Sequence, residues 1–231
     1  MSDVSRYDAL LELVKERRTV RRFKPDPVPP DRITKIIDVA RWAPSGFHTQ
    51  PWEFVVIIDK EVKEKVVAVL KEYGPPIRNP KPETIQAEDS RFDVAPVFII
   101  LLGDWRARTG LPDAAQSSDE RVNNTFRTSL ACAFLSMQLA ATSLGLASQW
   151  YSAVSGEQVQ SALKALIGFP EGLRVFDMMV LGYPAENPIP KDVRGVDEMI
   201  HYNACGKGDF RSEAEVIAYA RKTKAWCLGA H

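Results

Sequence analysis

The sequence predicts an α+β fold in which helices flank one central sheet. Helical and strand patterns alternate irregularly along the 231 residues, and no internal repeat is found. Four apolar runs have the length and composition of strands: residues 53–59, 95–103, 147–154 and 174–184. One long apolar stretch, residues 129–147, has the length of a helix that is buried on most sides. We therefore expect one sheet and one long central helix.

Near the amino end, a helix leads into an extended segment. Leu10, Leu13 and Val14 have the i, i+3, i+4 spacing of an amphipathic helix, and the same stripe reaches Arg17 at i+7. The helix would thus carry an arginine on its buried side, where the charge needs a partner. The β-branched "TVRRF" and the four prolines of residues 24–31 favour an extended chain after it.

Further helices are predicted from Pro30 to just before Pro44, and over residues 60–72, 129–147, 155–168 and 212–224. Ser155 is positioned as the N-cap of the helix that ends near Gly168. Residues 73–92 are predicted to be an irregular excursion, and residues 104–124 a polar loop that covers the mouth of a pocket.

The charge balance and the cysteines exclude several classes of partner. The chain has 30 basic and 30 acidic residues, so it lacks the footprint of a protein that binds nucleic acid or anionic lipid. The polar start lacks the apolar core of a signal peptide. Polar side chains such as Ser136, Gln138 and Thr142 argue against a membrane span in residues 129–147. Three widely spaced cysteines indicate no disulfide framework and no zinc site. A cytoplasmic protein is expected.

The stretch "RRTVRRF", residues 17–23, places four arginines in six positions of a chain with zero formal net charge. Guanidinium groups match phosphate oxygens in pairs, so a small anion is one explanation. In an extended chain Thr19 and Arg21 point the same way, which adds a hydroxyl to such a site. The alternative is a solvated basic face at the end of a helix, where cations also interact favourably with the helix dipole.

Motifs of protein-only catalysis are missing from the sequence. It contains no Gly-x-Ser-x-Gly, no His-Glu-x-x-His, no phosphate loop and no Gly-x-Gly-x-x-Gly after a strand. The three histidines, His48, His201 and His231, form no cluster that would bind a metal. If the protein is an enzyme, a cofactor would supply the difficult chemistry.

Two stretches together, "RRTVRRF" and "APSGFHTQPWEFVV", resemble the FMN-dependent nitroreductase family, which includes the iodotyrosine deiodinases. "LGLASQWYS" (144–152) and "LGYPAENPIPKDVRGVDEMI" (181–200) follow in the expected order. The resemblance covers residues 8–200. It implies one nitroreductase-like domain over residues 1–231, with a helical extension at 205–231. It also implies a three-layer sandwich around a mixed, mostly antiparallel sheet, in a domain-entwined homodimer.

The resemblance assigns the candidate cofactor-binding residues by position. Arg17 would bind the FMN phosphate, and Arg18 and Thr19 the phosphate or the ribityl chain. Arg21 would lie near the N1–C2=O edge of the ring, where reduction places negative charge. A loop against the partner's flavin would contain Pro44, Ser45 and Gly46, and Phe47 would face the substrate. The segment along the N5 side would be Trp150, Tyr151 and Ser152. Arg194, in the tail, would bind the phosphate.

The resemblance implies an oxidoreductase with a ping-pong reaction. NAD(P)H would reduce the flavin, and a nitroaromatic or quinone-like acceptor would then be reduced at flavin N5, without a catalytic side chain. The sequence departs from most relatives at His48, where they carry Asn. Ser152 would donate a hydrogen bond to N5, as in the deiodinase branch, although the lid acid, tyrosine and lysine of that branch are not evident in residues 71–92. Reductive dehalogenation of halophenols, flavin binding without turnover, and a flavin-free scaffold for an acidic partner remain alternatives.

Overall fold

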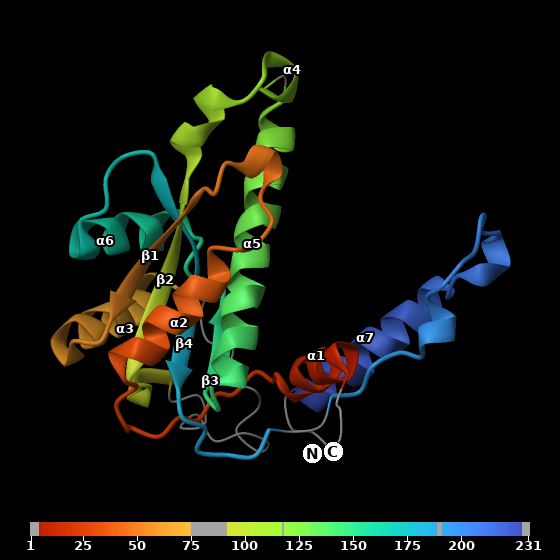
Figure 1. Ribbon diagram of the computed structural model, residues 1–231, viewed down its shortest axis with the longest axis horizontal. Coiled ribbons are helices and arrows are strands. Elements are labelled where there is room, and N and C mark those ends of the chain that lie inside the picture. Colours follow the sequence, from red (N-terminus) through yellow and green to blue (C-terminus); the bar gives the residue numbers. More distant parts are fainter. Residues whose placement is uncertain (1–4, 75–91, 117, 189–190, 228–231) are drawn as a thin grey trace. The chain divides into compact units, whose positions relative to one another are not determined.

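The computed structural model describes residues 5–74, 92–116, 118–188 and 191–227. Their contacts divide them into two compact units, one up to residue 188 and the other from residue 191 onward. The first unit contains a four-stranded sheet between two layers of helices (Figure 1). This arrangement confirms the α+β prediction.

The sheet has the strand order β1–β2–β4–β3, and every neighbouring pair is antiparallel. The strands are β1 (Trp52–Ile57), β2 (Val97–Asp104), β3 (Ala147–Tyr151) and β4 (Leu173–Gly182). The central strands β2 and β4 are buried on both faces, which explains their continuous apolar sequences. An isolated parallel bridge from Thr19 to Ser148 makes the sheet mixed but mostly antiparallel, as predicted. Strand β3 ends three residues earlier than expected, because the chain turns after Tyr151.

Helices cover both faces of the sheet and form two separate cores (Figure 1). Helices α2 (Pro30–Ala40) and α5 (Asp119–Ser143) pack on one face, and α3 (Lys60–Tyr73) and α6 (Glu157–Ile167) pack on the other. Successive side chains of β2 alternate between the two cores, as the pleat of a strand requires. The predicted three-layer sandwich is therefore present in the first unit.

The long helix α5 begins ten residues before the predicted start at residue 129. Ser118 caps it by accepting a hydrogen bond from the Arg121 N–H, and Asp119 and Glu120 complement the helix dipole in the first turn. Its 25 residues span about 37 Å at 1.5 Å per residue. The prediction of a loop over residues 104–124 is therefore wrong in part. Two short helices, η3 (Trp105–Gly110) and α4 (Asp113–Gln116), also lie there.

The cap predicted for α6 is displaced by one residue. Gly156 is the N-cap and provides no side-chain bond, so the prediction of Ser155 as the cap is wrong. The predicted end is confirmed: Gly168 has φ 81°, the left-handed conformation that glycine adopts most easily.

Helix α1 (Arg6–Glu16) does not bury its apolar stripe within this chain. Ser5 caps the helix through a hydrogen bond from the Asp8 N–H. Leu10 is 55% exposed and Val14 is 48% exposed, although Leu13 is half-buried. The expectation of a buried face is therefore wrong for the single chain, and two apolar side chains remain available for another surface.

The second unit contains η4 (Val196–Glu198), η5 (Lys207–Asp209) and α7 (Glu213–Cys227), which confirms the helix predicted over residues 212–224. The excursion predicted over residues 73–92 lies almost entirely outside the described residues. Two further short helices, η1 (Gly46–His48) and η2 (Phe92–Val94), belong to the first unit. None of the described helices has the length and hydropathy that a membrane span requires.

Candidate functional site

The arginine segment, defined here as residues 17–23, lies in an extended conformation along the edge of the sheet. The Val20 N–H donates to the Ser148 carbonyl of β3 at 3.1 Å. Phe23 forms an antiparallel bridge with Pro184, and the Lys24 N–H donates to the Tyr183 carbonyl at 2.9 Å. The segment is thus attached both to the start of β3 and to the chain that leaves β4.

Burial along the arginine segment differs sharply between neighbouring residues. Val20 is buried in the core, while Thr19 before it and Arg21 after it are exposed. Ser148, to which Thr19 is bridged, is itself buried and accepts a long hydrogen bond of 3.5 Å from Gln138 of α5. The backbone of the segment is therefore fixed, and the side chains of Thr19, Arg21 and Arg22 are exposed.

Arg17 lacks an acidic partner among the residues that the structure describes. It is half-buried at the end of α1. Burial, together with the charge of Arg18, lowers the pKa of the Arg17 guanidinium. The Arg18 guanidinium donates to the Arg17 carbonyl at 2.9 Å, and this contact provides no negative charge for either arginine. This end of the segment therefore has two cations and no counter-charge from the described chain.

The other end of the segment does have an acidic partner, which the sequence did not indicate. Glu186, which follows β4, accepts a hydrogen bond from the Arg21 N–H at 3.3 Å. Its other carboxylate oxygen lies 3.8 Å from Arg22 Nε. The four arginines are thus divided: Glu186 offsets the charge near residues 21 and 22, and the charge at residues 17 and 18 remains for a ligand.

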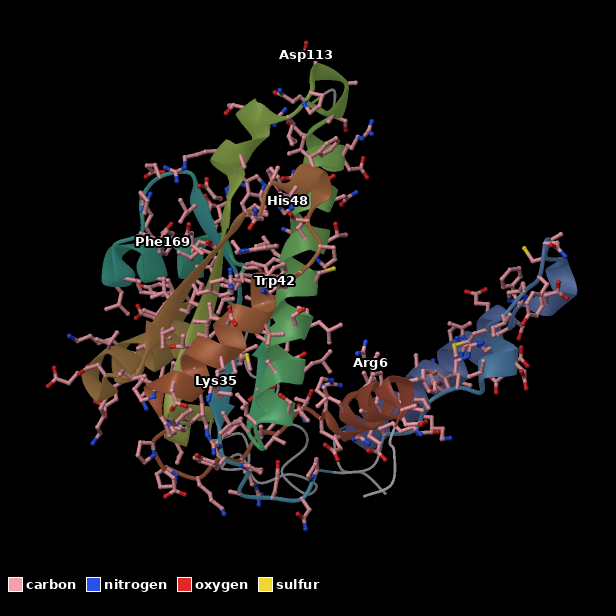
Figure 2. All side chains as sticks on the ribbon, viewed as in Figure 1. Arg6, Lys35, Trp42, His48, Asp113 and Phe169 are labelled. Carbon is pink, nitrogen blue, oxygen red and sulfur yellow. The ribbon has the colours of Figure 1, made fainter. Side chains whose placement is uncertain are left out.

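The loop of residues 44–50 is a second candidate element, and it contacts the amino-terminal half of α5. The Gly46 N–H donates to Ser129 Oγ at 3.0 Å, and Figure 2 shows His48 beside this half of the helix. A Cβ on Gly46 would overlap the methyl group of Thr125, so this close approach requires glycine. Three non-glycine residues of the loop have positive φ: Phe47 (53°), His48 (55°) and Gln50 (44°).

That backbone strain has a functional implication. Left-handed conformations cost about 1–2 kcal/mol for a residue with a Cβ, and they cluster where a loop serves a site. The loop holds its shape partly through Ser45, whose Oγ accepts from the Gln50 N–H at 3.1 Å. Pro44 is exposed, and Phe47 is 56% exposed, so the loop presents both side chains to the surroundings.

The end of β3 is the third candidate element. The Trp150 indole stacks on Phe134 of α5 with a centroid distance of 4.1 Å, and its Nε1–H donates to Asp177 Oδ2 at 2.6 Å. Tyr151 is half-buried on the opposite face of the sheet, where burial raises the pKa of its hydroxyl. Ser152 follows the strand and is exposed. The side chain of Trp150 is thus committed to the protein interior.

A model of the nitroreductase family matches residues 14–183, which is most of the chain. The chain belongs to the nitroreductase family. The matched range contains the arginine segment, the 44–50 loop and the β3–β4 pair, and the resemblance inferred from four sequence stretches is confirmed.

Relatives of this nitroreductase-family chain are named either as nitroreductases or as iodotyrosine deiodinases. A protein of Methanothermobacter thermautotrophicus whose name includes NADH dehydrogenase/NAD(P)H nitroreductase is 31% identical over 85% of this chain and 87% of its own length. An iodotyrosine deiodinase of Haliscomenobacter hydrossis is also 31% identical, over 81% of this chain and 84% of its own length.

Solved structures support the same fold. An oxidized iodotyrosine deiodinase bound to FMN and 3-iodo-L-tyrosine superimposes with a TM-score of 0.64 and 26% identity, covering 85% of this chain and all of its own. An NADPH:FMN oxidoreductase of Vibrio harveyi in complex with NAD⁺ has a TM-score of 0.70 at 18% identity, over 94% of this chain and 85% of its own. The prediction of a nitroreductase-like sandwich is therefore confirmed, and the entwined homodimer stays a prediction.

The structure brings some of the predicted site residues together and leaves others apart. Thr19 is bridged to β3, and Arg17 and Arg18 directly precede it in the chain, whereas the 44–50 loop contacts α5 at Ser129. The two segments are thus held by different elements of the first unit. Arg194 belongs to the second unit, where its guanidinium donates to the carboxylate and the carbonyl of one residue, Glu198.

Besides Glu186, the sequence did not indicate Asp177 and Gln149 as residues near the candidate site. Asp177 lies in β4, where it is an isolated acidic residue within a mostly apolar sequence. Gln149 is half-buried on β3, and among the described residues its Oε1 is the buried side-chain atom that lacks a hydrogen-bond partner. A polar residue inside a strand predicted to be buried is the signal that could have indicated both.

Proposed function

We propose that this chain is an FMN-dependent oxidoreductase. One observation carries the proposal: in a nitroreductase-family fold, Arg17 is half-buried and lacks an acidic partner among the described residues. It ends α1 two residues before Thr19, which is bridged to the sheet edge. A desolvated cation without a counter-charge is unfavourable by itself. A bound phosphate would convert it into a charge-assisted hydrogen bond, which is among the stronger polar interactions in proteins.

The residues present fit FMN. Arg17 and Arg18 would bind the phosphate, and the exposed hydroxyl of Thr19 would bind the phosphate or the ribityl chain. The unpartnered Oε1 of Gln149, on the strand bridged to Thr19, offers an acceptor to a ligand hydroxyl or N–H. Arg21 would stabilise the negative charge that develops on the N1–C2=O edge of the ring, as a fixed cation does at other charged transition states.

When bound, FMN would supply two-electron chemistry at N5, accepting a hydride from NAD(P)H and passing it to a small planar acceptor. The chain's own residues would bind, orient and exclude water. Ser152 would donate a hydrogen bond at N5, and Tyr151 and the backbone of Trp150 would line the ring. No side-chain acid or base is required for hydride transfer, which agrees with the absence of catalytic motifs from the sequence.

The complete site is proposed to form in a homodimer. Within one chain the 44–50 loop contacts α5 at Ser129, and the arginine segment contacts β3 at Ser148. A second copy would bring Pro44, Ser45 and Gly46 to the first copy's flavin, with Phe47 facing the substrate. In this dimer Leu135 of α5, which is 46% exposed, is proposed as one of the interface contacts.

Reductive dehalogenation of a halophenol is a second candidate function. The identity to the deiodinase of Haliscomenobacter hydrossis and the exposed hydroxyl of Ser152 directly after β3 favour it. In such a reaction two electrons and a proton replace a carbon–halogen bond by a carbon–hydrogen bond, and halide leaves.

A visible spectrum of the purified protein tests the proposal, followed by anaerobic addition of NADH and NADPH in turn. We expect a bound flavin that bleaches with at least one nucleotide and recovers its colour when a nitroaromatic or a quinone is added. Recovery with 3-iodotyrosine and release of iodide, without recovery by the other acceptors, would select the second candidate. A colourless protein that takes up no added FMN would refute both.

A further inference from the structure

A β-bulge in β4 places an acidic side chain in the core beside the candidate site. Leu101 of β2 pairs with Asp177, and the next residue, Leu102, pairs with Val175, so Phe176 is the extra residue. A bulge turns two consecutive side chains toward one face of a sheet. Here Phe176 packs in the core beneath α5, and the carboxylate of Asp177 meets Trp150 in the same layer.

The carboxylate of Asp177 and two aromatic rings hold the indole of Trp150. The indole Nε1–H donates to Asp177 Oδ2 at 2.6 Å, one face stacks on Phe134 at 4.1 Å, and Phe176 lies tilted at 6.3 Å. Trp150 is two residues before Ser152, at the end of β3. Because the indole cannot rotate without losing these contacts, they hold Trp150 in one orientation at the end of β3.

Asp177 is only 8% exposed, and its charge has little compensation. Burial raises the pKa of Asp177 to about 6, although the indole N–H and the guanidinium of Arg127 on α5 lower it. On β2 the nearest ionisable group is Asp104, which lies opposite Leu173 and is paired with Arg106. On β3 the ionisable residue is Tyr151, which faces the other core. Among the described residues, Arg127 is the charged group that acts on this carboxylate, and Arg174 of β4 instead lies over the Trp105 ring at 5.6 Å.

We propose that Asp177 is a positioning residue, whose carboxylate holds Trp150 and the end of β3 against the flavin and whose proton sets the pH dependence of flavin reduction. This inference rests on the proposed function, because it needs a flavin beside β3. An ionised Asp177 adds negative charge near a group that gains electrons, so it opposes reduction. A protonated Asp177 does not, and it also weakens the hydrogen bond that holds the indole.

The test compares the FMN-loaded protein with Asp177→Asn, which preserves the shape of the side chain and an acceptor for the indole. The first measurement follows tryptophan indole N–H resonances by NMR, with Trp150→Phe identifying the signal of Trp150. In the natural chain this signal should titrate near pH 6, and in Asp177→Asn it should not. The second measurement is the flavin midpoint potential against pH. The natural chain should have the lower potential above pH 6, and the difference should vanish below it.

Two variants should shift the pH of the break in the potential curve, and a control variant should not. Trp150→Phe and Arg127→Gln each remove a group that lowers the pKa of Asp177, so both should move the break in the potential curve to higher pH. Asp104→Asn changes a carboxylate at the end of β2 and should leave the break in place.

The outcomes separate this inference from the proposed function. A potential difference that is the same at all pH values indicates a purely structural Asp177 and overturns the inference, as does a break that survives in Asp177→Asn. Both results leave the flavin enzyme intact. A protein that binds no FMN overturns the proposed function and the inference with it.

Discussion

Arg17 is the single residue that links the fold most closely to a ligand, because it is half-buried and lacks an acidic partner among the described residues. Replacing it with alanine should weaken FMN binding by about ten- to a hundredfold. A charge-assisted hydrogen bond contributes about 1.5–3 kcal/mol, and each 1.4 kcal/mol corresponds to a factor of ten. Fluorescence titration of the apoprotein with FMN measures the change.

Arg22→Ala is the matched control for this prediction. It removes the same charge from the same segment, but Arg22 lies 3.8 Å from Glu186 and is not assigned to the phosphate. FMN affinity should change by less than Arg17→Ala changes it. Equal losses in the two variants would mean that the segment attracts the anion only by its total charge, without a specific contact from Arg17.

The buried carboxylate of Asp177 leads to a second prediction, which concerns the pH dependence of folding stability. Burial raises its pKa from the ordinary 3.8 to about 6, so between these values the folded chain binds more protons than the unfolded chain. The folded protein therefore loses stability as pH rises through this window, and the cost persists above it. Asp177→Asn should be more stable than the natural chain by roughly 1–3 kcal/mol above pH 6. Urea unfolding at several pH values measures the difference, which should disappear below about pH 4. A difference that does not depend on pH would contradict the prediction.

Among the structural elements, the contact between the 44–50 loop and α5 depends on the absence of a side chain at Gly46. A Cβ there would overlap Thr125 Cγ2, and a β-branched side chain in a helix has little freedom to rotate away. Gly46→Ala should therefore destabilise the protein by about 1–3 kcal/mol, as other overpacked sites do. Thermal unfolding measures the loss.

The rescue variant makes this prediction specific. Thr125→Ser removes the methyl group and retains the hydroxyl that donates to the Arg121 carbonyl. Adding it to Gly46→Ala should restore most of the lost stability. If the double variant is as unstable as Gly46→Ala alone, the overlap is not the cause.

Elements with strong apolar patterns could be predicted from the sequence, and their ends could not. The strands, α2, α3 and α7 lie close to their predicted ranges, because apolar periodicity and proline positions determine them locally. The start of helix α5 was predicted ten residues too late, because its first turns are polar and exposed, and only the cap at Ser118 indicates them. The bulge at Phe176 depends on pairing with β2, a contact between distant residues that no local pattern records.

The same distinction applies to the candidate site. The arginine segment and the 44–50 loop were found because their residue types are unusual for their neighbours. Glu186 and Gln149 were not, because their roles come from the position of one segment beside another. The partner of Arg22 is separated from it by more than 160 residues and is visible only in the folded chain.

At the scale of the whole molecule, the proposed dimer predicts that a charge on the open side of α5 prevents both association and flavin binding. Leu135 is 46% exposed there. Leu135→Arg should give a monomer by light scattering, with little bound FMN, because burying an unpaired charge in an interface is costly. Ala68→Arg, which adds the same charge to the exposed side of α3 on the opposite layer, should leave both properties unchanged. A Leu135→Arg monomer that retains FMN would contradict the two-chain site.

The central claim, that the arginines near the amino end bind the phosphate of a flavin, is tested most directly by comparing the affinities of the apoprotein for FMN and riboflavin. The two molecules differ only in the phosphate. If Arg17 and Arg18 bind that group, FMN should bind more tightly by at least about tenfold, the effect of one charge-assisted hydrogen bond. Equal affinities for the two flavins, or no binding of either, would contradict the account.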